Sequence, residues 1–182
     1  ELALIGEGPE IDAMRKDVDE MSMMLEDYLA FARGDSGEVA QPTDMAMALE
    51  ELRSDAERHG HTATVAFHGL PVVTVKPASF KRCLANLVSN AARHANTISI
   101  TGQRDHRYLN ITIDDDGPGI PADMREEVFK PFLRLDDARN QDEGGSGLGL
   151  AIARDIARSH GGDILLSESP MGGLRAAVRV PV

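Results

Sequence analysis

The chain is poor in the features that mark several other classes of protein. It has one cysteine in 182 residues, so it cannot form a disulfide within itself, and Cys83 has no cysteine or histidine at metal-ligand spacing. No window holds the roughly 18 apolar residues of a membrane-spanning helix, and the chain does not open on a signal peptide. We therefore expect a cytoplasmic piece, which can belong to a longer membrane-anchored parent, with Cys83 in its core.

Basic residues are also scarce. The chain has 19 lysines and arginines against 30 aspartates and glutamates, which gives a net charge of −11. This charge opposes attraction to a phosphate backbone or an anionic membrane, so nucleic acid is not an expected partner. The remaining composition, 42% hydrophobic and 27% charged, is typical of a soluble globular protein with one main domain and a small appended element.

The N-terminal segment carries apolar residues at alternating steps of three and four. This spacing is typical of a helix that pairs with another helix in a coiled coil. With residues 2–5 as the end of an earlier helix, it predicts part of a helical hairpin; the alternative is a single amphipathic helix docked on the main domain. The apolar positions are Ile11, Met14, Val18, Met21, Leu25, Tyr28 and Ala32.

A glycine-containing turn and a polar stretch follow this helix, and they divide the chain. We predict the partial hairpin over residues 1–36, a linker over 37–43 and the main domain over 44–182. In the main domain, hydrophobic periodicity predicts helices over 44–59, 80–94 and 148–160, and strands over 63–67, 72–75, 97–102, 108–114, 164–168 and 174–180. The expected fold class is α+β: a two-layer sandwich in which a mostly antiparallel sheet is covered by about three helices.

The predicted helix over 80–94 carries Asn86 and Asn90 four residues apart, so both amides lie on one side of it. Amide oxygens suit Mg²⁺, which prefers oxygen donors and reaches a nucleotide together with waters and phosphate oxygens. Arg93 lies in the next turn, within reach of a phosphate. The alternative is a surface helix with two solvated amides.

Two glycine-bearing segments follow the predicted strand over 108–114 in the sequence. The first, over 115–120, contains Asp115, whose carboxylate can accept a hydrogen bond from an exocyclic amine such as that of adenine. The alternative is that this segment is only a tight turn. The second, over 144–149, leads into a helix whose first N–H groups can receive phosphate oxygens. A charged segment, not a strand, precedes it, and no Lys-Ser/Thr follows it, so neither a Rossmann motif nor a P-loop is expected.

A polar run between the glycine segments has the composition of a mobile lid. Phe129 and Phe132 before it are expected to be packing anchors. Arg134 and Arg139 can reach phosphates from the lid, or they are incidental arginines of a solvated loop.

Four motifs together resemble the N, G1, F and G2 boxes of sensor histidine kinases, most closely the osmosensing class. The resemblance covers roughly residues 10–182, and the motifs occur in the family's order. They are Asn86-Leu87-x-x-Asn90-Ala91, Asp115-x-Gly117-x-Gly119-Ile120, Phe129-x-Pro131-Phe132 and Gly145-x-Gly147-Leu148-Gly149-Leu150.

The resemblance implies a Bergerat-type ATP-binding fold, shared with gyrase, mismatch-repair and heat-shock ATPases. It implies that Asn90 is the main Mg²⁺ ligand, that Asn86 supports it, and that Asp115 reads the adenine amine. His94 occupies a position where the family often has tyrosine. The implied ATP-binding residues are Asn86, Asn90, Arg93, His94, Asp115, Gly117, Gly119, Ile120, Arg134, Arg139, Gly145, Gly147, Leu148, Gly149 and Leu150.

The resemblance also implies transfer of the ATP γ-phosphoryl group to a histidine on the dimerisation hairpin of a homodimer, and then to an aspartate of a response-regulator receiver domain. Asn86 stands where related ATPases have a general-base glutamate, which favours transfer to a side chain over attack by water. None of the six histidines has the acceptor's sequence context, so we expect no self-labelling. The parent is expected to be anchored in the bacterial inner membrane. Alternatives are another Bergerat-type protein, such as an anti-sigma serine kinase, and a degenerate regulatory module.

Overall fold

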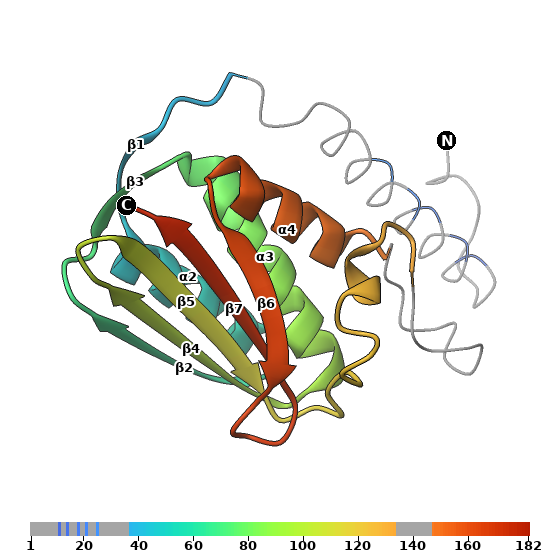
Figure 1. The fold of residues 1–182 in the computed structure, drawn as a ribbon. Coiled ribbons are helices and arrows are strands. Elements are labelled where there is room, and N and C mark those ends of the chain that lie inside the picture. The colour runs from blue at the N-terminus through green and yellow to red at the C-terminus, as the bar shows by residue number, and fades with distance from the viewer. Residues whose placement is uncertain are drawn as a thin grey trace.

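The structure, a computed structural model, describes residues 37–133 and 147–182 and five helical positions in the N-terminal segment (11, 14, 18, 21 and 25). In the two continuous ranges, helices α2, α3 and α4 lie on one face of a five-stranded sheet, as Figure 1 shows. The other face of the sheet carries no helix in this part of the chain. The predicted two-layer α+β arrangement is therefore confirmed.

The predicted helices and strands occur within a few residues of their expected limits. The helices are α2 (Met45–Arg58), α3 (Pro77–His94), α4 (Gly149–Ser159) and the 3-10 helix η2 (Glu127–Phe129). The strands are β1 (Gln41–Asp44), β2 (Thr62–His68), β3 (Val72–Val75), β4 (Thr97–Arg104), β5 (Tyr108–Asp115), β6 (Asp163–Glu168) and β7 (Leu174–Pro181).

The large sheet has the strand order β2-β4-β5-β7-β6, in which β2 and β4 are parallel and the other neighbours are antiparallel. Parallel neighbours require a crossover connection, and α3 supplies it. A separate pair, β1 and β3, is antiparallel with Gln41 opposite Val75. The last residues of the predicted linker, 41–43, thus form a strand on the main domain.

The core lies between the sheet and the helices. Phe80, Leu84 and Leu87 of α3 face inward with at most 2% of their surface exposed, against alternate residues of β4, β5 and β7. Burying each such side chain contributes about 1.5–3 kcal/mol. Cys83 is fully buried, as predicted, and its thiol donates to the Ala153 carbonyl of α4 at 3.3 Å. Burial raises the pKa of the Cys83 thiol to about 12, so it stays protonated.

The starts of two helices are capped by carboxylates. Asp44 caps α2 by accepting the Met47 N–H at 3.1 Å. The N-cap residue of α3, Lys76, makes no side-chain cap. Instead the Glu38 carboxylate, which precedes β1, accepts the N–H groups of Ala78 at 2.6 Å and Ser79 at 3.0 Å. The predicted linker region therefore caps the helix that carries the two asparagines.

The described part of the predicted N-terminal seam is helical, with Ile11 half-buried and the other four residues exposed. Met14, Val18, Met21 and Leu25 have 62%, 43%, 68% and 58% of their surface accessible. Apolar residues in such a row are the expected surface for a partner helix. Tyr28 and Ala32 of the seam lie outside the described residues. Within the described residues, no helix has the length and hydropathy needed to cross a membrane.

Candidate functional site

The amide of Asn86 lies against the first turn of α4. A side-chain carbon placed on Gly149 would lie 4.0 Å from the Cβ and Cγ of Asn86. Helix α4 begins there, and its N-cap residue, Leu148, provides no side-chain cap. The first turn of a helix presents N–H donors and the positive end of the helix dipole. Asn86 therefore borders a place suited to an anion such as phosphate.

Asn86 also has an unsatisfied polar group. Among the described residues, the Nδ2 of Asn86 is the one buried side-chain nitrogen or oxygen atom that has no hydrogen-bond partner. Such a group costs about 1–3 kcal/mol until an acceptor satisfies it. Asn90, one turn later, is partly buried, whereas Arg93 and His94 in the last turn are exposed. The residues present thus fit a ligand that brings oxygen atoms.

The last turn of α3 contacts the segment that begins at Asp115. A Cβ on Gly117 would lie 2.8 Å from the His94 carbonyl oxygen, so this backbone packs directly on the last turn of α3. Gly119 has a φ of 72°, a left-handed conformation that glycine adopts without strain. From Asn86 to His94 the helix advances about 12 Å. The predicted phosphate and base contacts therefore stand at separate ends of one helical stretch, with Asn90 between them.

The Asp115 carboxylate is 3% exposed and held by the main chain. Its Oδ1 accepts the N–H groups of Gly117 at 2.9 Å and Leu174 at 3.0 Å. The neighbouring Asp114 belongs to the opposite face of the sheet, where it forms two 2.8 Å bonds with Arg175. Only Asp115 of this aspartate pair is therefore placed to contact a ligand beside α3.

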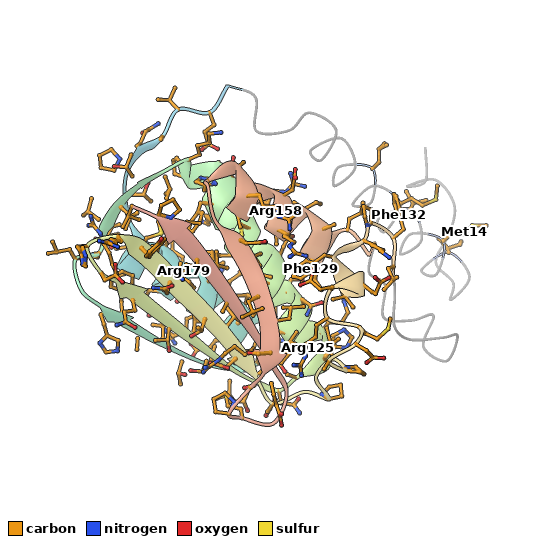
Figure 2. The ribbon with its side chains drawn as sticks, in the orientation of Figure 1. Met14, Arg125, Phe129, Phe132, Arg158 and Arg179 are labelled. Atoms are coloured by element: carbon orange, nitrogen blue, oxygen red, sulfur yellow. The ribbon has the colours of Figure 1, made fainter. Side chains whose placement is uncertain are left out.

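The F-box segment packs on α4 through Phe129. Figure 2 labels Phe129 on the segment that runs beside α4, and the Arg154 guanidinium of α4 lies 4.2 Å from the centre of its ring. Arg154 also pairs with Glu126 at 2.7 Å and with Asp163 of β6 at 2.8 Å. Burial acts to raise the pKa of Asp163, but hydrogen bonds led by that from Arg154 outweigh it and lower the pKa to about 2. This network joins η2, α4 and β6.

The prediction that Phe132 is a second packing anchor is wrong. Its side chain is 65% exposed and its φ is 66°. The Phe132 N–H donates to the Gly147 carbonyl at 3.0 Å, and a Cβ on Gly147 would lie 2.9 Å from the Phe132 carbonyl carbon. The backbone of Phe132 therefore packs directly on Gly147, and the ring lies at the surface.

The remaining predicted residues divide into two groups. Ile120 and Leu150 pack partly buried against the core, and Leu148 is 1% exposed, so Leu148 can offer a ligand its main chain but not its side chain. Arg134, Arg139 and Gly145 lie outside the described residues, and their roles stay predictions. In residues 37–133 and 147–182, no group of three or more His, Cys, Asp or Glu side chains could hold a metal.

Comparison with known proteins decides the family. Residues 75–182 match the family described as histidine kinase-, DNA gyrase B- and HSP90-like ATPases. The chain belongs to this ATPase family. The predicted Bergerat-type fold is therefore confirmed, and similarity to sensor histidine kinases confirms the ATP-binding catalytic region of the histidine-kinase type.

Individual ATPases of this kind are similar over most of the chain. The sensor histidine kinase CpxA of Escherichia coli (strain K12) is 32% identical over 97% of this chain, which spans 40% of CpxA. The ATP-binding domain of PrrB from Mycobacterium tuberculosis has a TM-score of 0.66 and 27% identity, over 78% of this chain and 96% of that domain. The histidine kinase domain of the Escherichia coli osmosensor EnvZ has a TM-score of 0.61 and 33% identity, over 82% and 92%.

Sequence reasoning missed the turn between β6 and β7 as part of the site. The Leu174 N–H donates to Asp115, and Gly173 leaves no room for a side chain beside that carboxylate, since a Cβ there would lie 2.2 Å from Oδ1. The signal in the sequence is Gly172-Gly173-Leu174, which joins the last two predicted strands and resembles the C-terminal pattern of sensor histidine kinases, but which carries no predicted ligand contact. Its position beside Asp115 depends on the pairing of β5 with β7.

Proposed function

We propose that this chain is the part of a sensor histidine kinase that binds Mg·ATP and presents the γ-phosphoryl group to a histidine on a dimerisation hairpin. The observation that carries the proposal is the buried, unsatisfied amide of Asn86 against the start of α4, on the helix whose other end meets Asp115. The similarity to CpxA supports it, although the chain spans 40% of that protein.

The roles proposed for the site residues are those that the family resemblance implies, and the positions of the described residues support them. The Asn90 amide, supported by Asn86, holds Mg²⁺, and the first N–H groups of α4 receive phosphate oxygens. Asp115 accepts the adenine amine through its carboxylate. Bound Mg²⁺ supplies charge neutralisation on the phosphate oxygens. Other proposed phosphate contacts come from the exposed Arg93 and from Arg134 and Arg139.

The chemistry of Asn86 supports transfer to a side chain over attack by water. A neutral amide cannot remove a proton from water as a glutamate would. An imidazole of the hairpin, held in line with the γ-phosphoryl group, serves as the nucleophile. The phosphoryl group then passes to an aspartate of a response-regulator receiver domain. The exposed seam of Met14, Val18, Met21 and Leu25 supports pairing of two subunits through the hairpin. We place the parent in the bacterial inner membrane, with this part in the cytoplasm.

Calorimetry with Mg·ATP tests the binding site. The chain should bind with a Kd between micromolar and millimolar, and Asn90→Ala should weaken Mg-dependent binding by about 30-fold or more, because it removes the proposed metal ligand. Asn110→Ala on β5, away from α3, is the matched control and should bind as the unchanged chain does. Equal affinity for the Asn90→Ala and unchanged chains would remove Asn90 from the site.

Labelling with γ-labelled ATP tests the transfer step. The 182-residue chain should remain unlabelled, since none of its six histidines has the acceptor context. Addition of an isolated hairpin that carries the family's histidine should produce acid-labile label on the hairpin. Label on the chain itself would contradict the absence of an acceptor, and no transfer to the hairpin would favour a regulatory ATP-binding module.

A further inference from the structure

The Asp115 carboxylate is oriented by a segment far from it in the sequence. Besides the bond from Gly117, its Oδ1 accepts the Leu174 N–H at 3.0 Å. The main-chain carbonyl oxygen of Asp115 accepts the Gly173 N–H at 3.2 Å. In residues 37–133 and 147–182, no hydrogen bond reaches Oδ2. The turn between β6 and β7 thus helps to satisfy Oδ1 of the carboxylate and leaves Oδ2 available to a ligand.

Gly173 is glycine because there is no space for a side chain. A Cβ there would lie 2.2 Å from Asp115 Oδ1, 2.5 Å from the Gly117 nitrogen and 2.6 Å from the Asp115 carbonyl oxygen. These distances are far inside van der Waals contact, so any side chain would displace the carboxylate. Gly172 differs, because its φ is 99° and a Cβ there would meet nothing within 4 Å. One glycine shapes the turn, and the next makes room for Asp115.

The turn itself is well held. The Ser169 N–H donates to the Gly173 carbonyl and the Gly172 N–H to the Ser169 carbonyl, both at 2.9 Å. Ser169 is 4% exposed, and its Oγ accepts the Met171 N–H at 3.0 Å. The Gly173 carbonyl oxygen also lies 3.3 Å from where a Cβ of Gly119 would be. The turn therefore contacts several parts of the Asp115 segment and is held by its own hydrogen bonds.

We propose that Gly173 is a positioning residue for nucleotide selection. By holding Asp115 with Oδ2 available, the β6–β7 turn makes the site prefer purines that carry an exocyclic amine over purines with an oxo group at that place. A fixed carboxylate oxygen accepts from an amine, whereas an oxo group faces it with a second acceptor. The inference rests on the proposed function, in which Asp115 contacts the base.

The test compares ATP with inosine triphosphate, which carries an oxo group in place of the amine. Calorimetry in the presence of Mg²⁺ should show that the unchanged chain prefers ATP by about 100-fold. Gly173→Ala should weaken ATP binding and leave inosine triphosphate binding nearly unchanged, so that the ratio falls by about tenfold or more. Gly172→Ala is the matched control: it strains the turn without a collision at Asp115 and should keep the ratio.

The outcomes separate this inference from the proposed function. If the unchanged chain binds neither nucleotide, or both equally, base reading by Asp115 fails. If it prefers ATP and folded Gly173→Ala keeps the same ratio, or Gly172→Ala loses it equally, only the role of Gly173 is overturned. If Gly173→Ala does not fold by circular dichroism, Ser169→Ala decides: a ratio lowered about threefold supports the proposal, and an unchanged ratio overturns it.

Discussion

The two ends of the candidate site differ in how much of their hydrogen bonding the protein completes by itself. At the base end, Asp115 already accepts two main-chain N–H groups. At the phosphate end, the buried Nδ2 of Asn86 has no partner among the described residues. The proposed base end is thus preorganised before a ligand arrives, whereas the proposed phosphate end keeps a donor that a ligand can satisfy.

This difference suits the chemistry of the two parts of a nucleotide. A neutral base is selected by a single fixed acceptor, and preorganising that acceptor removes the cost of ordering it on binding. Phosphate oxygens bring strong acceptors that can satisfy a waiting donor. In the proposed complex, a phosphate oxygen that accepts from the Asn86 amide recovers the cost of leaving it unsatisfied in the free protein.

Replacement of Asp115 should have the largest effect. Asp115→Asn keeps the size of the side chain but replaces one carboxylate oxygen with an NH2 group. That NH2 group faces either the backbone N–H groups or the adenine amine, so that two hydrogen-bond donors oppose each other. ATP affinity in calorimetry should fall about 100-fold, or about 2.8 kcal/mol. Asp114→Asn is the control, because it breaks the pair with Arg175 on the other face, and it should change affinity by less than about threefold. Equal losses for both variants would contradict the separate roles.

Replacement of Asn86 should separate stability from binding. Asn86→Leu removes a buried polar group that has no partner, so urea unfolding without nucleotide should show a gain of about 1 kcal/mol. Mg·ATP affinity should nevertheless fall about tenfold, because the ligand loses a contact. A variant that is less stable and binds ATP normally would reverse our assignment of the phosphate end.

Loss of the Glu38 cap should lower the stability that α3 contributes without changing ATP binding at either end of the site. Glu38→Ala removes the acceptor of the Ala78 and Ser79 N–H groups, so urea unfolding should show a loss of about 1 kcal/mol. ATP affinity should change by less than about twofold. Glu51→Gln, which affects only an exposed pair with Lys81, should cost less than about 0.5 kcal/mol. A large loss of ATP affinity in Glu38→Ala would mean that both ends depend on α3 as a whole.

The pH dependence of stability should show the contribution of the Arg154 network that joins η2, α4 and β6, and this effect should be the smallest. The pKa of Asp163 is lowered to about 2 in the folded chain, below its ordinary value of 3.8. Its contribution is therefore present above about pH 4 and is lost as the pH falls towards 2. Because Asp163 is half exposed, screening keeps the contribution modest.

Urea midpoints at pH 7 and pH 3 measure this contribution. The difference between the two midpoints should be smaller in Asp163→Asn than in the unchanged chain. Asp123→Asn, at an exposed position, is the control and should keep the full difference. An unaltered difference in Asp163→Asn would remove this aspartate from the acid sensitivity.

The elements that could be predicted from the sequence are those with strong local signals. Thr43 or Asp44 before a periodic apolar run predicts the start of α2, and the structure shows that Asp44 is the residue that caps it. The inward face of α3 and the hairpin of β4 and β5 follow from periods that a helix and a strand impose. Phe132 shows where this reasoning ends: an aromatic residue usually packs inside, but a backbone bond to Gly147 leaves it exposed.

By itself, the sequence determined the order and type of the elements, the two asparagines on one side of α3, and Asp115 at the end of a strand, because each depends on neighbours a few residues apart. Only the tertiary structure decided that the turn at Gly173 orients Asp115, that Asn86 faces the start of α4, and that Glu38 caps α3. These contacts join residues tens of positions apart. Local propensity carries no information about such pairs, since strand order and helix packing bring them together.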